Sequence, residues 1–331
     1  MIELNELLEA YRGVRVLVFG ASGFIGRWIS RYLTLAGADL WMVSRNMDKM
    51  SRIAKSYGLN GIFLQADLSD AGASKEVISH VAPQITFNTV GYGIDPLDQS
   101  DKLAWNLNDK LVGDIAEILQ ALDLPDWNGS RLVHMGSAKE YGPIYGLVKE
   151  NAQTVPLTLY GQSKLAGTKR LNRFCQKTGF PAIVVRLFSV YGPGEHPNRL
   201  LSSILMASMT QHHLALTSGE QRRDFIYIED VTEGLLRLGL LENRKGEIIH
   251  LATGRLHTVK EFVLCVAGFL NCSNGMLSFG EIPDQPDEWK HGPVSIELLS
   301  QLIHWQPTTP IEVGIQRAVE FIKKNAEGGI E

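Results

Sequence analysis

VRVLVFGASGFIG, residues 14–26, is the stretch of sequence that decides the fold. Its opening run, Val14–Phe19, is apolar and rich in β-branched residues, which predicts a strand buried on both faces. Residues Ile25–Ala36 have helical periodicity. Glycines separated by two residues stand between strand and helix, where a sharp turn lets phosphate oxygens approach the helix N-terminus. A plain tight turn is the alternative, but the position after a first strand favours a dinucleotide site. The predicted contact residues are Gly20, Ser22, Gly23, Phe24, Ile25 and Gly26.

Short β-branched runs alternate with helical segments over the rest of the first half, a pattern typical of a parallel sheet covered by helices on both faces. The predicted strands are Leu40–Val43, Ile62–Gln65, Ile85–Thr89, Arg131–Met135 and Ala182–Leu187, and the predicted helices are Met47–Tyr57, Ser74–Val81, Lys102–Leu122 and Gly161–Thr178. The fold class is therefore α/β, with a doubly wound parallel sheet. After Leu187 the pattern becomes irregular, which indicates a smaller, interleaved second unit.

The charge balance limits the partners of the chain. Lys plus Arg number 32 and Asp plus Glu 36, a formal net charge of −4. This balance argues against binding to nucleic acid or to an anionic membrane surface, either of which needs a concentrated basic face. No apolar run approaches the roughly 18 residues of a membrane span, and the first residues lack the pattern of a signal peptide. The cysteines Cys175, Cys265 and Cys272 show no metal-type spacing, so we expect reduced thiols, no metal site and a cytoplasmic location.

The end of the second predicted strand bears on the choice of cofactor. A carboxylate there would bind the ribose 2′-hydroxyl of NAD, but the chain has Ser44 followed by Arg45. A guanidinium can pair with a 2′-phosphate through charge-assisted hydrogen bonds. A solvated surface arginine is the alternative. The sequence therefore favours NADP, with NAD possible.

A candidate catalytic group follows from Tyr160 and Lys164, which lie four residues apart and so share one face of a helix. Ser137 lies just beyond a predicted strand, at the edge where a doubly wound sheet binds its ligands. These types suit hydride chemistry on an alcohol or ketone: the phenol exchanges a proton with the reacting oxygen, the ammonium stabilises the phenolate and the serine hydroxyl holds the oxygen. Lowering a phenol pKa from about 10 to about 7 requires roughly 4 kcal/mol, which one cation at about 4 Å supplies at an effective dielectric near 20. We therefore expect a partly dry site in which Lys164 acidifies Tyr160, helped by the positive charge of the oxidised nicotinamide.

Taken together, these motifs resemble the extended short-chain dehydrogenase/reductase family, particularly its nucleotide-sugar epimerases, dehydratases and reductases. The matching segments are GASGFIG (20–26), GSAKEYG (136–142), YGQSK (160–164), RLFSVYGPGE (186–195), RRDFIYIEDV (222–231) and HWQP (304–307). The resemblance implies a Rossmann domain formed by residues 1–187 and 223–255, and a smaller α/β substrate domain formed by residues 188–222 and 256–331. It also implies a nucleoside-diphosphate sugar as substrate and a homodimer formed through the helices near 102–122 and 161–178.

The resemblance further implies roles for single residues. Asp67 and Leu68 would lie near the adenine, Arg223 would hold the substrate diphosphate, and Asn108 would be a structural asparagine in a helix. Ser189 takes the place of a customary asparagine in the substrate site. Tyr92, in an unusual loop, is a candidate substrate contact with a packed loop aromatic as the alternative, and Arg199 completes the predicted substrate set.

One departure from the family pattern narrows the reaction. Dehydratases carry an acidic pair directly after the catalytic serine or threonine, where this chain has Ala138 and Lys139. Glu140 follows one place later, and we expect it to pair with Lys139 or solvent. Elimination of water is therefore disfavoured.

Three functions remain. The first is an NADP-dependent reductase acting at C4 of a 4-keto-6-deoxy nucleoside-diphosphate sugar, favoured by Arg45. The second is an NAD(P)-dependent 4-epimerase, which has the same machinery. The third is a non-catalytic dinucleotide-binding regulator, against which Tyr160 and Lys164 speak.

Overall fold

The computed structural model describes residues 2–93, 98, 100–273, 275–284 and 291–327. Within these residues, seven parallel strands form the main sheet in the order β11-β6-β5-β4-β1-β2-β3. Their bounds are β1 (Arg15–Phe19), β2 (Asp39–Ser44), β3 (Ile62–Gln65), β4 (Ile85–Asn88), β5 (Leu132–Ser137), β6 (Ala182–Leu187) and β11 (Lys245–Leu251). The predicted doubly wound fold is therefore confirmed, and the strand order reverses between β1 and β4, where such sheets bind ligands.

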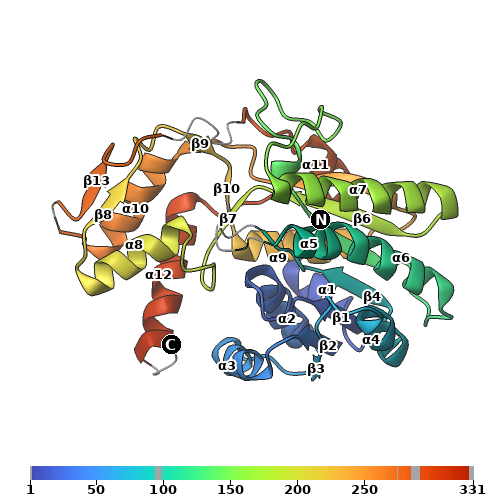
Figure 1. Cartoon of the computed structure of the whole chain (residues 1–331). Coiled ribbons are helices and arrows are strands. Elements are labelled where there is room, and N and C mark those ends of the chain that lie inside the picture. Colours follow the sequence, from blue (N-terminus) through green and yellow to red (C-terminus); the bar gives the residue numbers. More distant parts are fainter. Residues whose placement is uncertain (1, 94–97, 99, 274, 285–290, 328–331) are drawn as a thin grey trace.

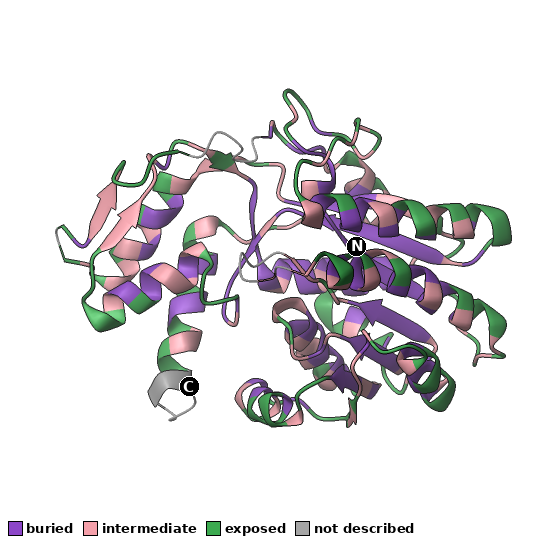
Figure 2. Cartoon of the chain, viewed as in Figure 1, coloured by how far each residue is buried: buried purple, intermediate pink, exposed green. Residues whose placement is uncertain are grey.

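Helices cover both faces of the sheet because its strands are apolar on both sides (Figures 1 and 2). Val16 and Val18 of β1 point into one core, and Leu17 and Phe19 point into the other. The first core includes side chains of α1 (Leu4–Glu9), α2 (Phe24–Ala36), α3 (Met47–Tyr57) and α9 (Ile228–Gly239). The second includes side chains of α4 (Ala73–Val81), α6 (Leu111–Ala121) and α7 (Leu159–Thr178).

A smaller group of elements lies beside the carboxyl edge of the sheet, at the left of Figure 1. It contains the helices α8 (Leu200–Thr210), α10 (Val259–Leu270) and α12 (Ile311–Glu327), with α11 (Glu297–Ile303) nearer the sheet. The short strands pair as β7 (Ser189–Tyr191) with β10 (Phe225–Tyr227), β8 (Leu214–Leu216) with β13 (Leu277–Phe279), and β9 (Arg222–Arg223) with β12 (His257–Thr258). Residues 245–251 return to the main sheet as β11, while the exact domain boundaries stay a prediction.

The structure differs from the sequence expectations at two places. The helix expected over 102–122 is built as α5 (Asp101–Trp105), a π-helical segment η1 (Asn106–Lys110) and α6. The turn-rich stretch after Leu187 contains the strand β7, which the sequence pattern did not predict because three residues are too few to show an alternation of apolar and polar side chains. A strand this short is decided by its partner, β10, which the chain supplies 34 to 38 residues later in sequence. None of the helices in the described ranges is long and apolar enough to span a bilayer.

Phe262 of α10 tests the packing of the smaller group. Its ring stacks on Phe225 at 4.4 Å between centroids and meets Tyr191 edge-on at 5.1 Å, so one side chain joins α10 to β7 and β10. We expect Phe262→Ala to lower the free energy of unfolding by about 3–5 kcal/mol, because it leaves a cavity in this core. Leu264→Ala, at an exposed position of the same helix, should change it by less than about 0.5 kcal/mol. Urea denaturation measures the free energy of unfolding of both variants, and equal losses would contradict this packing role of Phe262.

Candidate active site

The turn after β1 is shaped by close backbone approaches. Gly20 has φ +77°, and a Cβ there would lie 2.7 Å from the hydroxyl of Thr89, which donates to the carbonyl of Phe19. A Cβ on Gly26 would collide with the carbonyl of Gly20. The N-cap residue of α2 is Gly23, which has no side chain with which to cap the first turn. The free N–H groups of this turn suit a pyrophosphate, so the residues present fit a dinucleotide.

A pocket of about 210 Å³ opens at the carboxyl ends of β1, β2 and β4. Most residues predicted for the cofactor line it, namely Gly20, Ser22, Gly23, Ser44, Arg45, Asp67 and Leu68, together with Val43, Lys49, Ala66, Thr89, Val90, Gly91, Tyr92 and Leu107. Phe24, Ile25 and Gly26 form the first turn of α2 behind the glycine loop. The Ser44 hydroxyl donates to the Ser22 hydroxyl at 3.0 Å, which ties the end of β2 to that loop.

One end of this pocket is strongly basic. Burial lowers the pKa of Lys49, and the nearby charges of three guanidinium groups, Arg27, Arg45 and Arg52, lower it further. Sequence reasoning singled out Arg45 and missed the others. Arg27 donates to the carbonyls of Gly23 (3.0 Å) and Ser22 (2.9 Å), so it also holds the loop itself. Arg27 could have been identified from the sequence as the basic residue directly after Gly26, the third glycine of the loop.

The predicted catalytic residues converge at the carboxyl end of β5. Ser137 ends that strand, and α7, which begins after the N-cap Thr158, presents Tyr160 and Lys164. The Lys164 ammonium is almost fully buried and donates to the carbonyls of Val90 (3.1 Å) and Met135 (3.0 Å). These bonds anchor α7 to the ends of β4 and β5.

Burial dominates the pKa values of Tyr160 and Lys164 in the chain by itself. Burial raises the pKa of Tyr160 to about 12; the Ser137 hydroxyl and the charge of Arg199 lower it, and the charge of Glu140 raises it. Burial also lowers the pKa of Lys164 to about 8, against the charge of Glu140. The dry environment disfavours the charged form of both groups, and the expected acidification of the phenol by Lys164 together with the oxidised nicotinamide stays a prediction. The phenol of the chain by itself is protonated at neutral pH.

Asn108 holds the loop beside this pair. It lies in the π-helical segment η1 and is fully buried. Its side-chain amide donates to the carbonyl of Tyr92 (2.7 Å) and to the hydroxyl of Ser163 (3.0 Å), and its oxygen accepts from the N–H of Tyr92 (3.0 Å). The asparagine therefore joins α7 to the loop that lines the cofactor pocket, in the structural role that the resemblance implied.

The predicted substrate residues are less closely gathered. Tyr92 lines the cofactor pocket, and its hydroxyl accepts from the N–H of Ser100 (3.2 Å), so the ring packs within its own loop while its contact with substrate stays a prediction. Arg199, at the N-cap of α8, is exposed and near enough for its charge to act on Tyr160. Ser189 is half-buried in β7, and Arg223 lies in β9, paired with β12.

Glu140 is a correction to the sequence analysis. Its side chain is fully buried, and its carboxylate pairs with Arg186 of β6 at 2.9 Å instead of facing solvent or Lys139. The partner lies 46 residues away in sequence, so no local pattern could identify it. Among the described residues, no group of three or more His, Cys, Asp or Glu side chains could hold a metal ion.

Comparisons with known proteins show the family of the chain. The model of the NAD dependent epimerase/dehydratase family matches residues 16–252, so the chain belongs to that family. It is thus an enzyme of the extended short-chain dehydrogenase/reductase type, as the motifs predicted. This membership favours an enzyme over the non-catalytic regulator.

Individual relatives differ in their described activities. An uncharacterized UDP-glucose epimerase of Bacillus subtilis is 26% identical over an alignment that covers 59% of this chain and 61% of that protein. The dTDP-6-deoxy-L-talose 4-dehydrogenase (NAD(P)(+)) of Kitasatospora kifunensis is 26% identical over 75% of this chain and 77% of its own. The structure of an epimerase from Methanothermobacter thermautotrophicus superposes with a TM-score of 0.84 at 23% identity, covering 98% of this chain and 96% of that one, which shows the shared fold.

We expect Asn108→Ala to lower the free energy of unfolding by about 1–3 kcal/mol, because it strands the buried N–H and C=O groups of Tyr92. It should also weaken dinucleotide binding, since Tyr92 lines the pocket. Asn106→Ala is the matched control: it lies in the same π-helical segment and donates to the carbonyl of Ser69 at 2.9 Å, away from the Tyr92 loop. Urea denaturation and calorimetric titration with the dinucleotide measure the two effects. A control that weakens dinucleotide binding as much would contradict this account.

Proposed function

We propose that this enzyme is an NADP-dependent reductase acting at C4 of a 4-keto-6-deoxy nucleoside-diphosphate sugar. The observation that carries the proposal is the arrangement along one sheet edge: a basic cluster at one end of the cofactor pocket and a protonated phenol, with Ser137 beside it, near the other. The relative described as a 4-dehydrogenase supports hydride transfer at that carbon.

The basic end of the pocket supports NADP. Arg45 and Lys49 line it, and the charge of Arg27 acts on Lys49 from α2. Such a cluster favours the extra phosphate of NADP, which carries up to two negative charges. At the end of β2 the chain has Ser44 in place of a carboxylate, which would bind a free 2′-hydroxyl and repel a phosphate.

The chemistry assigned to the side chains follows from their states. When bound, the nicotinamide supplies the hydride for the carbonyl carbon. Tyr160, protonated by its burial, donates its proton to the carbonyl oxygen, so the ketone becomes a hydroxyl. The Ser137 hydroxyl donates a hydrogen bond to the same oxygen and orients it. Lys164, fixed by two carbonyls, places its charge where it stabilises the phenolate that remains.

The residues after Ser137 argue against dehydration. Ala138 is buried and cannot transfer a proton, and the ammonium of Lys139 carries the opposite charge to a carboxylate. Eliminating water from a sugar requires a general acid and a general base beyond the hydride-transfer pair. The proposed substrate therefore arrives with its 4-keto group already formed.

A 4-epimerase is the second candidate, supported by the relative described as a UDP-glucose epimerase. The two reactions differ in stoichiometry. Purified enzyme incubated with 4-keto and 4-hydroxy nucleotide sugars should consume one NADPH for each 4-keto sugar converted. Conversion of a 4-hydroxy sugar to its C4 epimer without net change in reduced cofactor would instead establish the epimerase.

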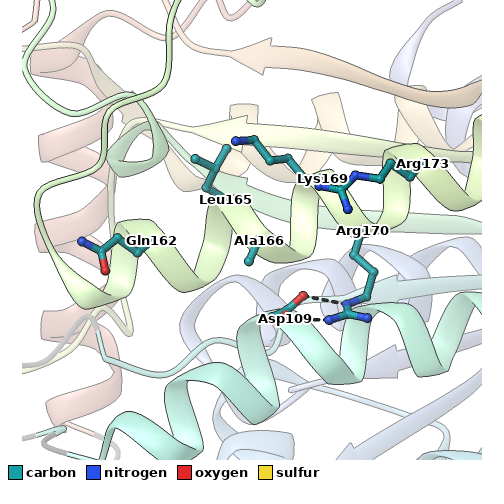
Figure 3. Close-up of a pocket in the computed structure, with 7 residues that line it drawn as sticks. All are labelled: Asp109, Gln162, Leu165, Ala166, Lys169, Arg170 and Arg173. Atoms are coloured by element: carbon teal, nitrogen blue, oxygen red, sulfur yellow. Dashed lines mark hydrogen bonds and ion pairs between the residues drawn. The ribbon is translucent and has the colours of Figure 1, made fainter.

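The proposed assembly is a homodimer formed through η1, α6 and α7. Figure 3 shows the outer side of this region, where Arg170 of α7 clamps Asp109 of η1 with hydrogen bonds of 2.7 and 2.9 Å. A shallow pocket of about 300 Å³ lies beside the clamp. The clamp holds the two helical segments as one rigid surface, which is what a helix-to-helix interface between copies requires.

We expect Tyr160→Phe to lower kcat about 10²- to 10⁴-fold with little change in cofactor binding, because it removes the proton donor and keeps the ring. Steady-state assay of NADPH oxidation and calorimetry measure the two. Retention of full activity would overturn the assigned chemistry.

We expect Arg45→Ala and Lys49→Ala each to raise the dissociation constant for NADPH about tenfold, since each removes a charge-assisted contact to the 2′-phosphate. The dissociation constant for NADH should stay unchanged. Lys55→Ala, an exposed lysine in the last turn of α3, controls for net charge. Equal effects on both cofactors would contradict the NADP assignment.

A further inference from the structure

A buried ion pair lies directly behind the catalytic serine. Glu140, at the end of the short 3-10 turn η2 (Ala138–Glu140), has no exposed surface, and Arg186 of β6 is 2% exposed. The guanidinium donates from Nε to Oε2 of Glu140 at 2.9 Å, and its Nη2 lies 2.9 Å from the same oxygen in the ion pair. It also lies 4.3 Å from the ring centre of Tyr141 and donates to the carbonyl of Glu150 at 3.3 Å. Both partners are therefore held in single positions.

The backbone around the pair leaves room for the carboxylate. A Cβ on Gly136 would lie 2.8 Å from Oε1 of Glu140 and 3.0 Å from a methyl of Val184. A larger residue at 136 would thus displace the carboxylate or the strand. Buried ion pairs of this kind add little to stability, because apolar residues of similar volume commonly do as well. Stability alone therefore does not explain why Gly136, Glu140 and Arg186 occupy positions that apolar residues could fill.

That charge reaches every predicted catalytic residue. Oε1 of Glu140 accepts from the N–H of Ser137 at 2.8 Å, in a capping box that fixes the backbone of the serine. The negative charge of Glu140 also raises the pKa of Tyr160 and of Lys164. The Ser137 hydroxyl, in turn, accepts from the N–H of Lys139 at 3.2 Å, so the turn closes on itself.

We propose that Glu140 is a positioning residue of the hydride-transfer site, which fixes the Ser137 backbone and holds one buried negative charge behind Tyr160 and Lys164. The inference rests on the proposed function for the identity of that site. Its effect on the reaction is to keep Lys164 charged and the Tyr160 phenol protonated, the two states from which the reduction begins. Arg186 pairs with the carboxylate in this dry position at 2.9 Å.

Other charges near the pair act in known directions. Tyr160 is faced by Glu140 from the end of η2 and by Arg199 from the N-cap of α8, and the two charges act on its pKa in opposite directions. Lys164 is faced by Glu140 and by His134 of β5, whose pKa is lowered by burial and by the Lys164 charge, so the histidine is neutral. Glu140 is therefore the anion that acts on both members of the pair.

The first test is a titration of Lys164 without cofactor or sugar. Nuclear magnetic resonance of lysine side-chain carbons, with the Lys164 signal assigned by Lys164→Arg, follows its pKa from about 8 in the starting protein. Glu140→Gln keeps an acceptor for the Ser137 N–H and removes the charge, so the pKa should fall by about one pH unit or more. Glu150→Gln is the matched control, because its carboxylate lies in the same Arg186 neighbourhood and approaches the N–H of His250 at 3.4 Å rather than Ser137. An unshifted Lys164 in Glu140→Gln, or an equal shift in the control, overturns the proposal.

The second test separates charge from position through activity. In the reduction the rate falls as pH rises through the pKa of Tyr160, and Glu140→Gln should move that fall to lower pH. Glu140→Asp keeps the charge, but its side chain is too short to reach the Ser137 N–H. We therefore expect kcat to fall about 10- to 100-fold while the fall of the rate with rising pH stays at the same pH. If both variants show the starting protein's profile and rate, the proposal fails. The Lys164 titration is independent of substrate, so its outcome stands whether or not the protein reduces a 4-keto sugar.

A folding defect is covered by a second variant. Glu140→Gln leaves Arg186 buried without its anion, so Glu140→Gln combined with Arg186→Met removes both charges and retains the acceptor for Ser137. This double variant should fold and show the same downward shift of the Lys164 pKa. A folded double variant with an unshifted Lys164 overturns the proposal.

Discussion

The site depends on the buried ammonium of Lys164. Its bonds to the carbonyls of Val90 and Met135 bring the start of α7 against the ends of β4 and β5, since a buried cation must find acceptors wherever the chain provides them. Val90 lies two residues after the end of β4, and Met135 lies two residues before the end of β5. Through this one group, Tyr160 meets Ser137 on one side and the cofactor pocket on the other.

Burial sets the resting state of the two titratable groups in opposite directions. It raises the pKa of the Tyr160 phenol and lowers that of the Lys164 ammonium, so both tend to be uncharged. The Glu140 carboxylate opposes the loss of charge on the lysine and reinforces the protonation of the phenol. A protonated phenol is the state from which the proposed reduction begins, which links the electrostatics of the chain to the direction proposed for the reaction.

The phosphate-binding and proton-donating ends of the site are joined by the parallel sheet. Because all the main strands run in one direction, the glycine turn after β1, the basic residues after β2 and Ser137 at the end of β5 reach the same edge. The smaller group of elements lies beside that edge.

Local features of the chain were accessible from its residues alone. The glycine spacing, the strand and helix periods and the i, i+4 relation of Tyr160 and Lys164 all lie within one turn or one element, where backbone geometry fixes which side chains share a face. The features that give these residues their chemistry are long-range: Glu140 pairs with Arg186, Asn108 holds the Tyr92 loop, and burial raises the pKa of Tyr160. Such contacts depend on which distant segments the packed sheet brings together and on how much water it excludes, and neither quantity is written in the spacing of residues along the chain.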